Sequence, residues 1–431
     1  MKRAISLLLL FAPLTIAPLN AQKIQHVIVI FQENRSTDNM FQDPVLVAEG
    51  ADIASSGLNS KGQIIKLQPQ PLRNNYDIAH GHNSFELMYD NGKMDGADKL
   101  PITCRNGPPK CPPAAAQFKF VNPAEVAPYF QLAEQYTFAD RMFQTNQGPS
   151  FPAHQFIISG TSAPFETSDL FAAENPLGAP DTGDDTGCTA PAKEYVALID
   201  PMGNESSRMY PCFEHMTLFD LLDAKGVSWR YYTESANTIW TGPNAIKHIR
   251  FGQDWKNVIL NPKQVLSDIS GFQLPAVSWV IPNGAESDHP SFNMGTGPSW
   301  VASIVNAVGN SPYWSDTAIF ITWDDWGGWY DHVPPTIYDS YEYGFRVPMI
   351  VVSSYAKQHY ISHVDHDFGS ILKFIEEKFD LGSLGFADSR ADNLSDCFDF
   401  TKPHSFRTIP APYDANYFLH DKTPPIPLDD D

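Results

Sequence analysis

The sequence has little charge for its length, and positive charge is especially scarce. Of its 431 residues, 18% are charged and 13% are aromatic. Disordered chains and coiled coils need more charge and fewer aromatic side chains, so both classes are excluded. The 29 Lys and Arg residues stand against 50 Asp and Glu, which gives a net charge of −21. Such a surface repels phosphate backbones, which argues against nucleic acid as a partner. An anionic substrate would need a metal ion or a few basic groups to reverse the field locally.

Long apolar runs are also scarce, with one exception at the N-terminus. A basic start, Met1-Lys2-Arg3, leads into an apolar stretch centred on residues 7–11, and the small residue Ala21 follows. This pattern is typical of a secretory signal peptide covering residues 1–21. The alternative is a membrane anchor, but Pro13 and Pro18 interrupt a run that is already short. No later segment approaches about 18 uninterrupted apolar residues. We therefore expect a secreted or periplasmic protein without stable membrane insertion.

Cysteine is rare as well, and its spacing fits no CxxC zinc pattern. In an oxidising compartment, cysteines that are close in the chain can form disulfides. Proximity predicts the pairs Cys104–Cys111 and Cys188–Cys212, with Cys397 left over.

Apolar, β-branched runs alternate with helical patterns along the chain. Strands are predicted at residues 23–31, 276–281, 317–322 and 347–353, and helices at 123–136, 215–225, 300–308 and 367–379. This alternation predicts an α/β fold with a mostly parallel central sheet flanked by helices. Residues 40–120 and 161–212 are rich in Pro, Gly, Asn and Asp, and we expect long loop excursions there that carry lids or substrate walls. Without a repeat or a linker, residues 22–431 are expected to form a single domain.

Polar side chains follow two of the predicted strands. Glu33 and Asn34 come after the first, and Asp324 and Asp325 come after the 317–322 strand. Ligands in open α/β sheets bind beyond the carboxyl ends of the strands, so these four side chains are expected at one edge. Crowded carboxylates repel unless a cation lies among them, and oxygen ligands suit a hard divalent ion. The alternative is that Glu33 caps a helix and the Asp pair forms a solvated turn.

Ser150 stands between Gly-Pro and an apolar run, as at the start of a helix. Its hydroxyl can cap that helix, or it can act as a nucleophile supported by the helix dipole and a metal. The local sequence alone favours the cap.

Histidines are the candidates for proton transfer. His80, His82 and His289 lie in polar segments, and an imidazole can hold a phosphoryl oxygen or protonate a leaving group. The alternative for each is a structural side chain. His154 and His366 are weaker candidates.

Two further side chains near the Asp pair are candidates for substrate contact. His332 is expected to order the turn behind the Asp pair or to contact substrate. Trp326, with Trp329 and Tyr330, is expected to pack in the core or to cradle a cationic head group.

Five segments carry a family resemblance: 26–36, His80 with 92–96, 148–150, 322–335 and 344–348. In this combination and order, the chain resembles the bacterial phosphoesterase family that joins phospholipases C with secreted acid phosphatases. The resemblance covers about Ile24 to Leu381 and implies an alkaline phosphatase-like fold.

The resemblance also implies roles for individual residues. Glu33, Asn34, Asp324 and Asp325 match family metal ligands, and Ser150 matches the nucleophile, which also contacts the metal. His80 and His289 match histidines around the bound phosphate. The implied protein is a secreted hydrolase of phosphoric esters, with one divalent metal ion and a phosphoseryl intermediate.

The sequence departs from the family pattern at a few positions. Thr37 and Asn39 replace an aromatic residue and a His, Pro152-Ala-His-Gln replaces the Pro-Asn-Arg usual in phospholipases C, and Asp325 replaces a frequent Glu. These departures count against lipid cleavage and make a general phosphomonoesterase or another diesterase plausible. The alternatives are a phospholipase C that cleaves phosphatidylcholine-type lipids and a non-catalytic protein that binds phosphate ligands. A sulfatase would need a Cys-x-Pro-x-Arg-type segment, which this sequence lacks.

Overall fold

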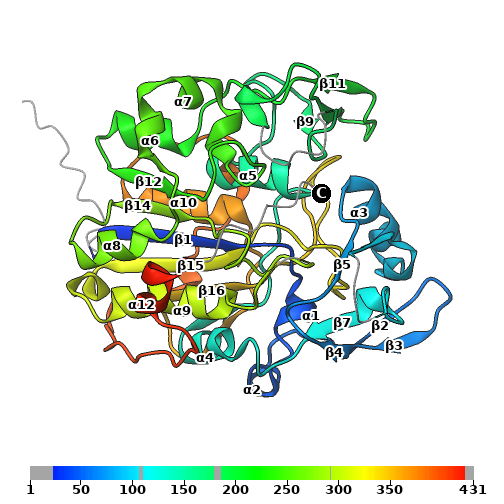
Figure 1. The fold of residues 1–431 in the computed structure, drawn as a ribbon, viewed down its shortest axis with the longest axis horizontal. Coiled ribbons are helices and arrows are strands. Elements are labelled where there is room, and N and C mark those ends of the chain that lie inside the picture. The colour runs from blue at the N-terminus through cyan, green and yellow to red at the C-terminus, as the bar shows by residue number, and fades with distance from the viewer. Residues whose placement is uncertain (1–22, 106–109, 179–185, 292, 423–431) are drawn as a thin grey trace, which may run out of the picture.

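A central eight-stranded sheet organises the computed structural model, which describes residues 23–105, 110–178, 186–291 and 293–422. The strand order is β13-β12-β14-β1-β15-β16-β8-β17. β1 (His26–Gln32) lies in the middle of the sheet, between β14 (Val277–Val280) and β15 (Thr317–Trp323), as Figure 1 shows. The predicted signal peptide, residues 1–21, lies outside the described residues.

The sheet is mostly parallel, as the alternation of strands and helices predicts. β1 pairs in parallel with both of its neighbours, and β12 (Trp229–Tyr232) and β13 (Val258–Ile259) continue the parallel order. β16 (Met349–Ser353) is antiparallel to β15 and to β8 (Thr137–Ala139), and β17 (Tyr360–Ser362) runs parallel to β8. The predicted α/β fold class is therefore confirmed.

Helices cover both faces of the sheet (Figure 1). One layer holds α5 (Ser150–Ser159), α6 (Leu218–Ala224) and α10 (Phe368–Lys378). The other holds α4 (Ala127–Gln135), α8 (Gln264–Ser270), α9 (Gly297–Gly309) and α12 (Ala415–His420). Covered on both sides, β15 is buried along its whole length and β1 after its first residue. This burial explains why both strands are nearly continuous apolar runs rather than alternating ones.

The predicted helices are present, but several begin later than the sequence suggests. α4 begins at Ala127, not at residue 123, because Asn122 and Glu125 close a turn through both a backbone and a side-chain hydrogen bond. α6 begins after Thr217, which forms a capping box with Asp220. α10 begins after Asp367, whose side chain accepts from the Ser370 backbone N–H.

The two excursions form small sheets and short helices. The first contains α1 (Thr37–Met40), α2 (Pro44–Glu49), β2 (Ser56–Leu58), β3 (Ile64–Lys66), β4 (Gln68–Gln70), β5 (Tyr76–Ile78), α3 (His82–Tyr89), β6 (Ile102–Cys104) and β7 (Lys119–Val121). The second contains β9 (Phe171–Ala172), β10 (Val196–Ile199) and β11 (Ser207–Met209). In Figure 1, β5 and α3 lie beyond the end where β1 leads into α1, which is the carboxyl end of the parallel strands.

Both predicted disulfides are present, Cys104–Cys111 with a Cα–Cα distance of 5.9 Å and Cys188–Cys212 with 4.4 Å. Each closes a loop within one of the excursions. Cys397 is a free, buried thiol. Across the described ranges, no helix combines the length and apolarity needed to cross a bilayer.

Candidate active site

Two adjacent parallel strands bring together the acidic residues that follow them. In the register of β1 and β15, Gln32 lies opposite Trp323, so Glu33 and Asp324 leave the sheet side by side. The Asn34 N–H donates to Asp324 Oδ1 at 3.0 Å, and the Arg35 N–H donates to the Asp325 carbonyl at 2.9 Å. The sequence interpretation that placed these side chains at one edge therefore matches the observed geometry.

A glycine allows the Asp pair to approach the first loop closely. Gly327 has a φ of +60°, and a Cβ there would lie 2.2 Å from the Asn34 carbonyl oxygen. A larger residue would push Asn34 away and would also be strained in this left-handed conformation. The tight turn after Asp325 thus requires glycine.

Ser150 is the first residue of α5 and does not cap it. The N-cap position is Pro149, and it makes no side-chain hydrogen bond. The Ser150 hydroxyl instead donates to Asp325 Oδ2 at 3.0 Å. The capping interpretation that the local sequence favours is therefore wrong, because the hydroxyl is directed at the acidic cluster.

A buried histidine completes a group of potential metal ligands. One oxygen of Glu33, one of Asp324 and a nitrogen of His154 all lie within 4.8 Å of one another, and all three residues are buried. His154 Nε2 is 3.5 Å from Glu33 Oε1 and 3.8 Å from Asp324 Oδ2. Within the described chain, these atoms have no hydrogen-bond partner, and neither do Glu33 Oε2 and Asn34 Oδ1. Buried polar atoms are normally satisfied, so this concentration of orphaned ligand atoms fits a cation.

The electrostatics of the cluster support the same conclusion. Burial, followed by the charge of Asp324, raises the pKa of Glu33 well above its usual value. The same two causes raise the pKa of Asp325 to about 7. Burial lowers the pKa of His154 to about 4, so its imidazole is neutral near pH 7. Without a cation, the protein holds these carboxylates at a considerable electrostatic cost.

His80 lies against the same cluster. Its Nδ1 hydrogen-bonds the Ile78 carbonyl at 2.7 Å, and its Nε2 is 3.0 Å from Asn34 Nδ2 and 3.8 Å from Asp325 Oδ2. The Asn34 amide thus donates to His80 and leaves its own oxygen free for the cluster. His289 is buried and faces Asp77. Its Nδ1 lies 3.9 Å from Asp77 Oδ2 and 2.8 Å from the Pro290 carbonyl oxygen.

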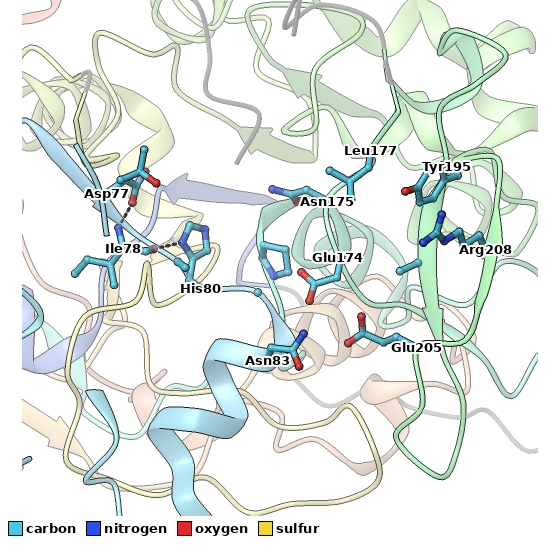
Figure 2. Close-up of a pocket in the computed structure, with 15 residues that line it drawn as sticks. Asp77, Ile78, His80, Asn83, Glu174, Asn175, Leu177, Tyr195, Glu205 and Arg208 are labelled. Carbon is cyan, nitrogen blue, oxygen red and sulfur yellow. Dashed lines mark hydrogen bonds between the residues drawn. The ribbon is translucent and has the colours of Figure 1, made fainter. Parts of the chain in front are cut away.

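A pocket of about 500 Å³ opens beside His80 and Pro149. Residues of both excursions form its walls, as expected for substrate walls: Asp77, Ile78, Ala79, His80, Gly81, Asn83 and Thr103 from the first, and Glu174, Asn175, Leu177, Tyr195, Ala197, Glu205 and Arg208 from the second. Figure 2 shows the carboxylates of Glu174 and Glu205 on the side of the pocket opposite His80, with Arg208 next to Tyr195. The Arg208 guanidinium lies 4.3 Å from the Tyr195 ring centroid. Burial, then the charge of Glu205, raises the pKa of Glu174 to about 7.

The three predicted substrate contacts lie elsewhere. His82 lines a neighbouring pocket, where its Nδ1 is 3.2 Å from the Gln147 carbonyl. Trp326 is fully buried and packs edge-on against Phe345. His332 lies in an ionic network with Asp38 and Asp52. The structure brings none of these three side chains into the lining of the pocket beside His80 and Pro149.

Asp38, Asp331 and His332 form a second group of potential ligand atoms. The protein's own cations neutralise it, since Arg346 donates to Asp331 Oδ1 at 2.8 Å and to Asp38 Oδ1 at 3.3 Å. His332 bridges two acids, with Nδ1 at 2.7 Å from Asp38 Oδ2 and Nε2 at 2.9 Å from Asp52 Oδ1. This group therefore has a structural role, since it connects the first excursion to the loop after β15.

The His332 bridge predicts a loss of stability in alkali. Burial lowers its pKa, but the hydrogen bond and charge of Asp38 outweigh this and raise it from 6.5 to about 9. The stabilisation of the fold by protonated His332 is thus fully present below pH 6.5 and is lost as the pH rises through 9. Since one pH unit is worth about 1.4 kcal/mol, we expect the unfolding free energy to fall by on the order of 3 kcal/mol.

Urea unfolding of wild type and His332→Gln across this pH range measures the effect. The variant should start less stable and lose much less stability with rising pH. Parallel curves for the two proteins would assign the alkaline loss to other groups.

The sequence reasoning predicted substrate walls in both excursions but named none of the second excursion's wall residues, and it underrated His154. His154 follows Ser150 by four residues on the predicted helix, which places both on one helix face. That spacing was the available signal. Glu174, Glu205 and Arg208 come from an irregular segment, where no periodicity relates sequence position to direction.

The family model and the phospholipase C relatives, together with the fold, define the class of the protein as an α/β enzyme that hydrolyses phosphoric esters. The chain belongs to the phosphoesterase family, whose model matches residues 24–382.

Curated relatives carry phospholipase names. Phospholipase C A of Mycobacterium tuberculosis is 23% identical over 443 residues, covering 89% of this chain and 79% of that protein. The non-hemolytic phospholipase C of Pseudomonas aeruginosa is 22% identical, over 90% of this chain and 58% of that protein. The non-specific phospholipase C6 of Arabidopsis thaliana is 24% identical, over 56% of this chain and 43% of that protein.

Among solved structures, a protein of the alkaline phosphatase superfamily from Vibrio parahaemolyticus superposes with a TM-score of 0.38 at 9% identity. The superposition covers 85% of this chain and 70% of that one.

Proposed function

We propose that this chain is an exported, metal-dependent phosphoric-ester hydrolase that acts through a phosphoseryl intermediate on Ser150. One observation carries the proposal. The Ser150 hydroxyl lies at the start of a ten-residue helix and donates to Asp325 at 3.0 Å, in a cluster of orphaned buried ligand atoms. This arrangement is the one expected of an activated nucleophile.

Glu33, Asn34, Asp324 and Asp325 are proposed to hold one divalent cation next to Ser150. Three carboxylates and an amide oxygen match the ligand preferences of such ions, and the unsatisfied oxygens of Glu33, Asn34 and Asp324 are available to bind one. When bound, the cation supplies positive charge that favours a serine alkoxide and neutralises charge on a phosphate.

Ser150 is proposed to begin the reaction by giving its proton to Asp325 and attacking phosphorus in line. The new Oγ–P bond forms as the bond from phosphorus to the leaving oxygen breaks. The hydroxyl stands at the N-terminus of α5, whose dipole favours the negative charge that develops there. A water then hydrolyses the phosphoserine, and Ser150 recovers its proton.

His80 or His289 is proposed to hold the phosphate oxygens and to protonate the leaving alcohol. His80 is the better placed of the two, because its Nε2 lies between Asn34 and Asp325 and its side chain lines the pocket. The hydrogen bond from Nδ1 to the Ile78 carbonyl fixes the ring, so Nε2 is the nitrogen that exchanges a proton with substrate, in place of the hydrogen bond that it accepts from Asn34.

The relatives favour a second candidate, a phospholipase C that cleaves phosphodiesters such as phosphatidylcholine-type lipids. A head-to-head assay separates the two. p-Nitrophenyl phosphate, bis(p-nitrophenyl) phosphate and phosphatidylcholine vesicles are each offered to metal-stripped and metal-restored protein. A monoesterase turns over the first fastest, whereas a phospholipase C favours the vesicles. If the restored protein hydrolyses none of them but binds inorganic phosphate, it is a binding protein and the proposal is wrong.

Export is part of the proposal. The pattern of residues 1–21 is that of a signal peptide, and disulfides such as the two in this fold persist in oxidising compartments. The substrate is accordingly proposed to be an extracytoplasmic phosphate ester or phospholipid head group.

A further inference from the structure

One helix presents two different donor atoms to the acidic cluster. Ser150 and His154 are four residues apart on α5, so they lie on the same helix face. The Ser150 oxygen meets Asp325, and the His154 nitrogen meets Glu33 and Asp324. The hydroxyl and the imidazole therefore approach the row of carboxylates at different points.

The surroundings of His154 define which of its nitrogens is free. The Tyr231 hydroxyl donates to the Trp240 carbonyl at 2.8 Å, so its oxygen can accept from His154 Nδ1 at 3.4 Å. A proton on Nδ1 leaves a bare lone pair on Nε2 of the neutral ring. That lone pair faces two carboxylates and has no hydrogen-bond partner within the described chain. In this fully buried arrangement, a cation that joins the three groups would satisfy all of these atoms at once.

We propose that His154 is a nitrogen ligand of the cation site, together with Glu33 and Asp324, and that it makes the site select a transition metal ion over Mg²⁺ or Ca²⁺. This inference rests on the proposed function and assigns the metal class of the same site. The 3.5 and 3.8 Å separations can be bridged by one ion, because metal–nitrogen and metal–oxygen bonds are about 2.0–2.2 Å long.

The ligand chemistry supports the selectivity. Mg²⁺ and Ca²⁺ take oxygen ligands almost entirely, whereas imidazole suits Zn²⁺, Fe²⁺ and related ions. Tyr231 holds the ring from behind through the other nitrogen, as the outer partners of metal-binding histidines commonly do. The Trp240 carbonyl in turn fixes the Tyr231 hydroxyl.

The test compares the full-length wild type with His154→Gln and with His215→Gln as the matched control. His215 is also buried and neighbours α5, but its Nε2 bonds the Ser159 hydroxyl at 3.1 Å. Each protein is stripped of metal, and its affinities for Zn²⁺ and Mg²⁺ are measured by competition with a chromophoric chelator. We expect His154→Gln to lose about 30-fold or more in Zn²⁺ affinity and less than about 3-fold in Mg²⁺ affinity. The control should match the wild type. An equal loss for both ions, or none, would overturn the inference.

Pulsed electron paramagnetic resonance of the Mn²⁺-loaded wild type gives a readout that does not depend on any variant folding. Nitrogen coupling should be present and should change when the histidines carry ¹⁵N. It should also be diminished in His154→Gln and retained in His215→Gln. Hydrolysis is measured on the same samples. Activity without nitrogen coupling overturns this inference alone, whereas a protein that binds no divalent ion and hydrolyses nothing overturns the proposed function as well.

Discussion

Replacing Ser150 with Ala should lower kcat/KM for p-nitrophenyl phosphate by about 10⁴-fold or more, as expected when a nucleophile is removed. The hydroxyl that is proposed to form the bond to phosphorus is lost, while the carboxylates and His80 stay in place. The fold should be retained, because the side chain makes one hydrogen bond, to Asp325, and begins a helix that it does not cap. Steady-state kinetics at saturating metal measure the effect.

Ser159→Ala is the matched control at the other end of the same helix. Its hydroxyl bonds the carbonyls of Gln155 and Thr161 and lies away from the acids, so the variant should keep nearly the wild-type rate. Acid quenching of the wild type during turnover should trap a phosphoryl group on the peptide that contains residue 150, and mass spectrometry detects it. A Ser150→Ala protein that turns over at the wild-type rate would disprove the nucleophile assignment.

Removing the metal should abolish activity and lower the melting temperature of the wild type. Loss of the charge that a cation supplies removes several kcal/mol of transition-state stabilisation, equivalent to about a thousand-fold in rate. An ion present at 100 times its Kd stabilises the fold by about 3 kcal/mol, and chelation removes this contribution. Thermal melts and assays with EDTA, followed by add-back of metal, measure both effects.

Asp324→Asn should separate metal binding from stability. It removes one buried negative charge beside Glu33, whose pKa Asp324 raises, so the metal-free variant should melt higher than the metal-free wild type. Metal should then add little to its stability, and activity should be lost. Asp331→Asn is the opposing control, since Asp331 pairs with Arg346 and its loss should destabilise the protein with or without metal. A lower melting temperature for metal-free Asp324→Asn would contradict the electrostatic account of the cluster.

The central strands were predictable because strands that are buried on both faces consist of continuous apolar runs. β1 and β15 carry such runs, and the Glu and Asp residues that follow them were therefore placed together correctly. β8, β13 and β17 are two or three residues long, which is too short for a periodic signal. β12 reads Trp-Arg-Tyr-Tyr, so its side chains carry no clear strand pattern.

The site was predictable where it follows from sheet topology and unpredictable where it follows from loops. Ser150 was proposed as the nucleophile through family resemblance, since its local sequence favours a cap that the structure does not contain. The pairing of His332 with Asp38 and Asp52 depends on the position of an irregular segment in the folded protein. The sequence could therefore indicate an ordering role for His332 but not the partners of its side chain. The walls around Glu174 and Glu205 are set by the same kind of long-range packing.

The juxtaposition of β1 and β15 has a consequence for how the protein is made. Asn34 and Asp324, which hydrogen-bond directly, are 290 residues apart in the chain. During synthesis, β1 therefore cannot pair with β15 until three quarters of the polypeptide has been translated. Such a distant partner makes folding slow and leaves the nascent chain exposed to aggregation.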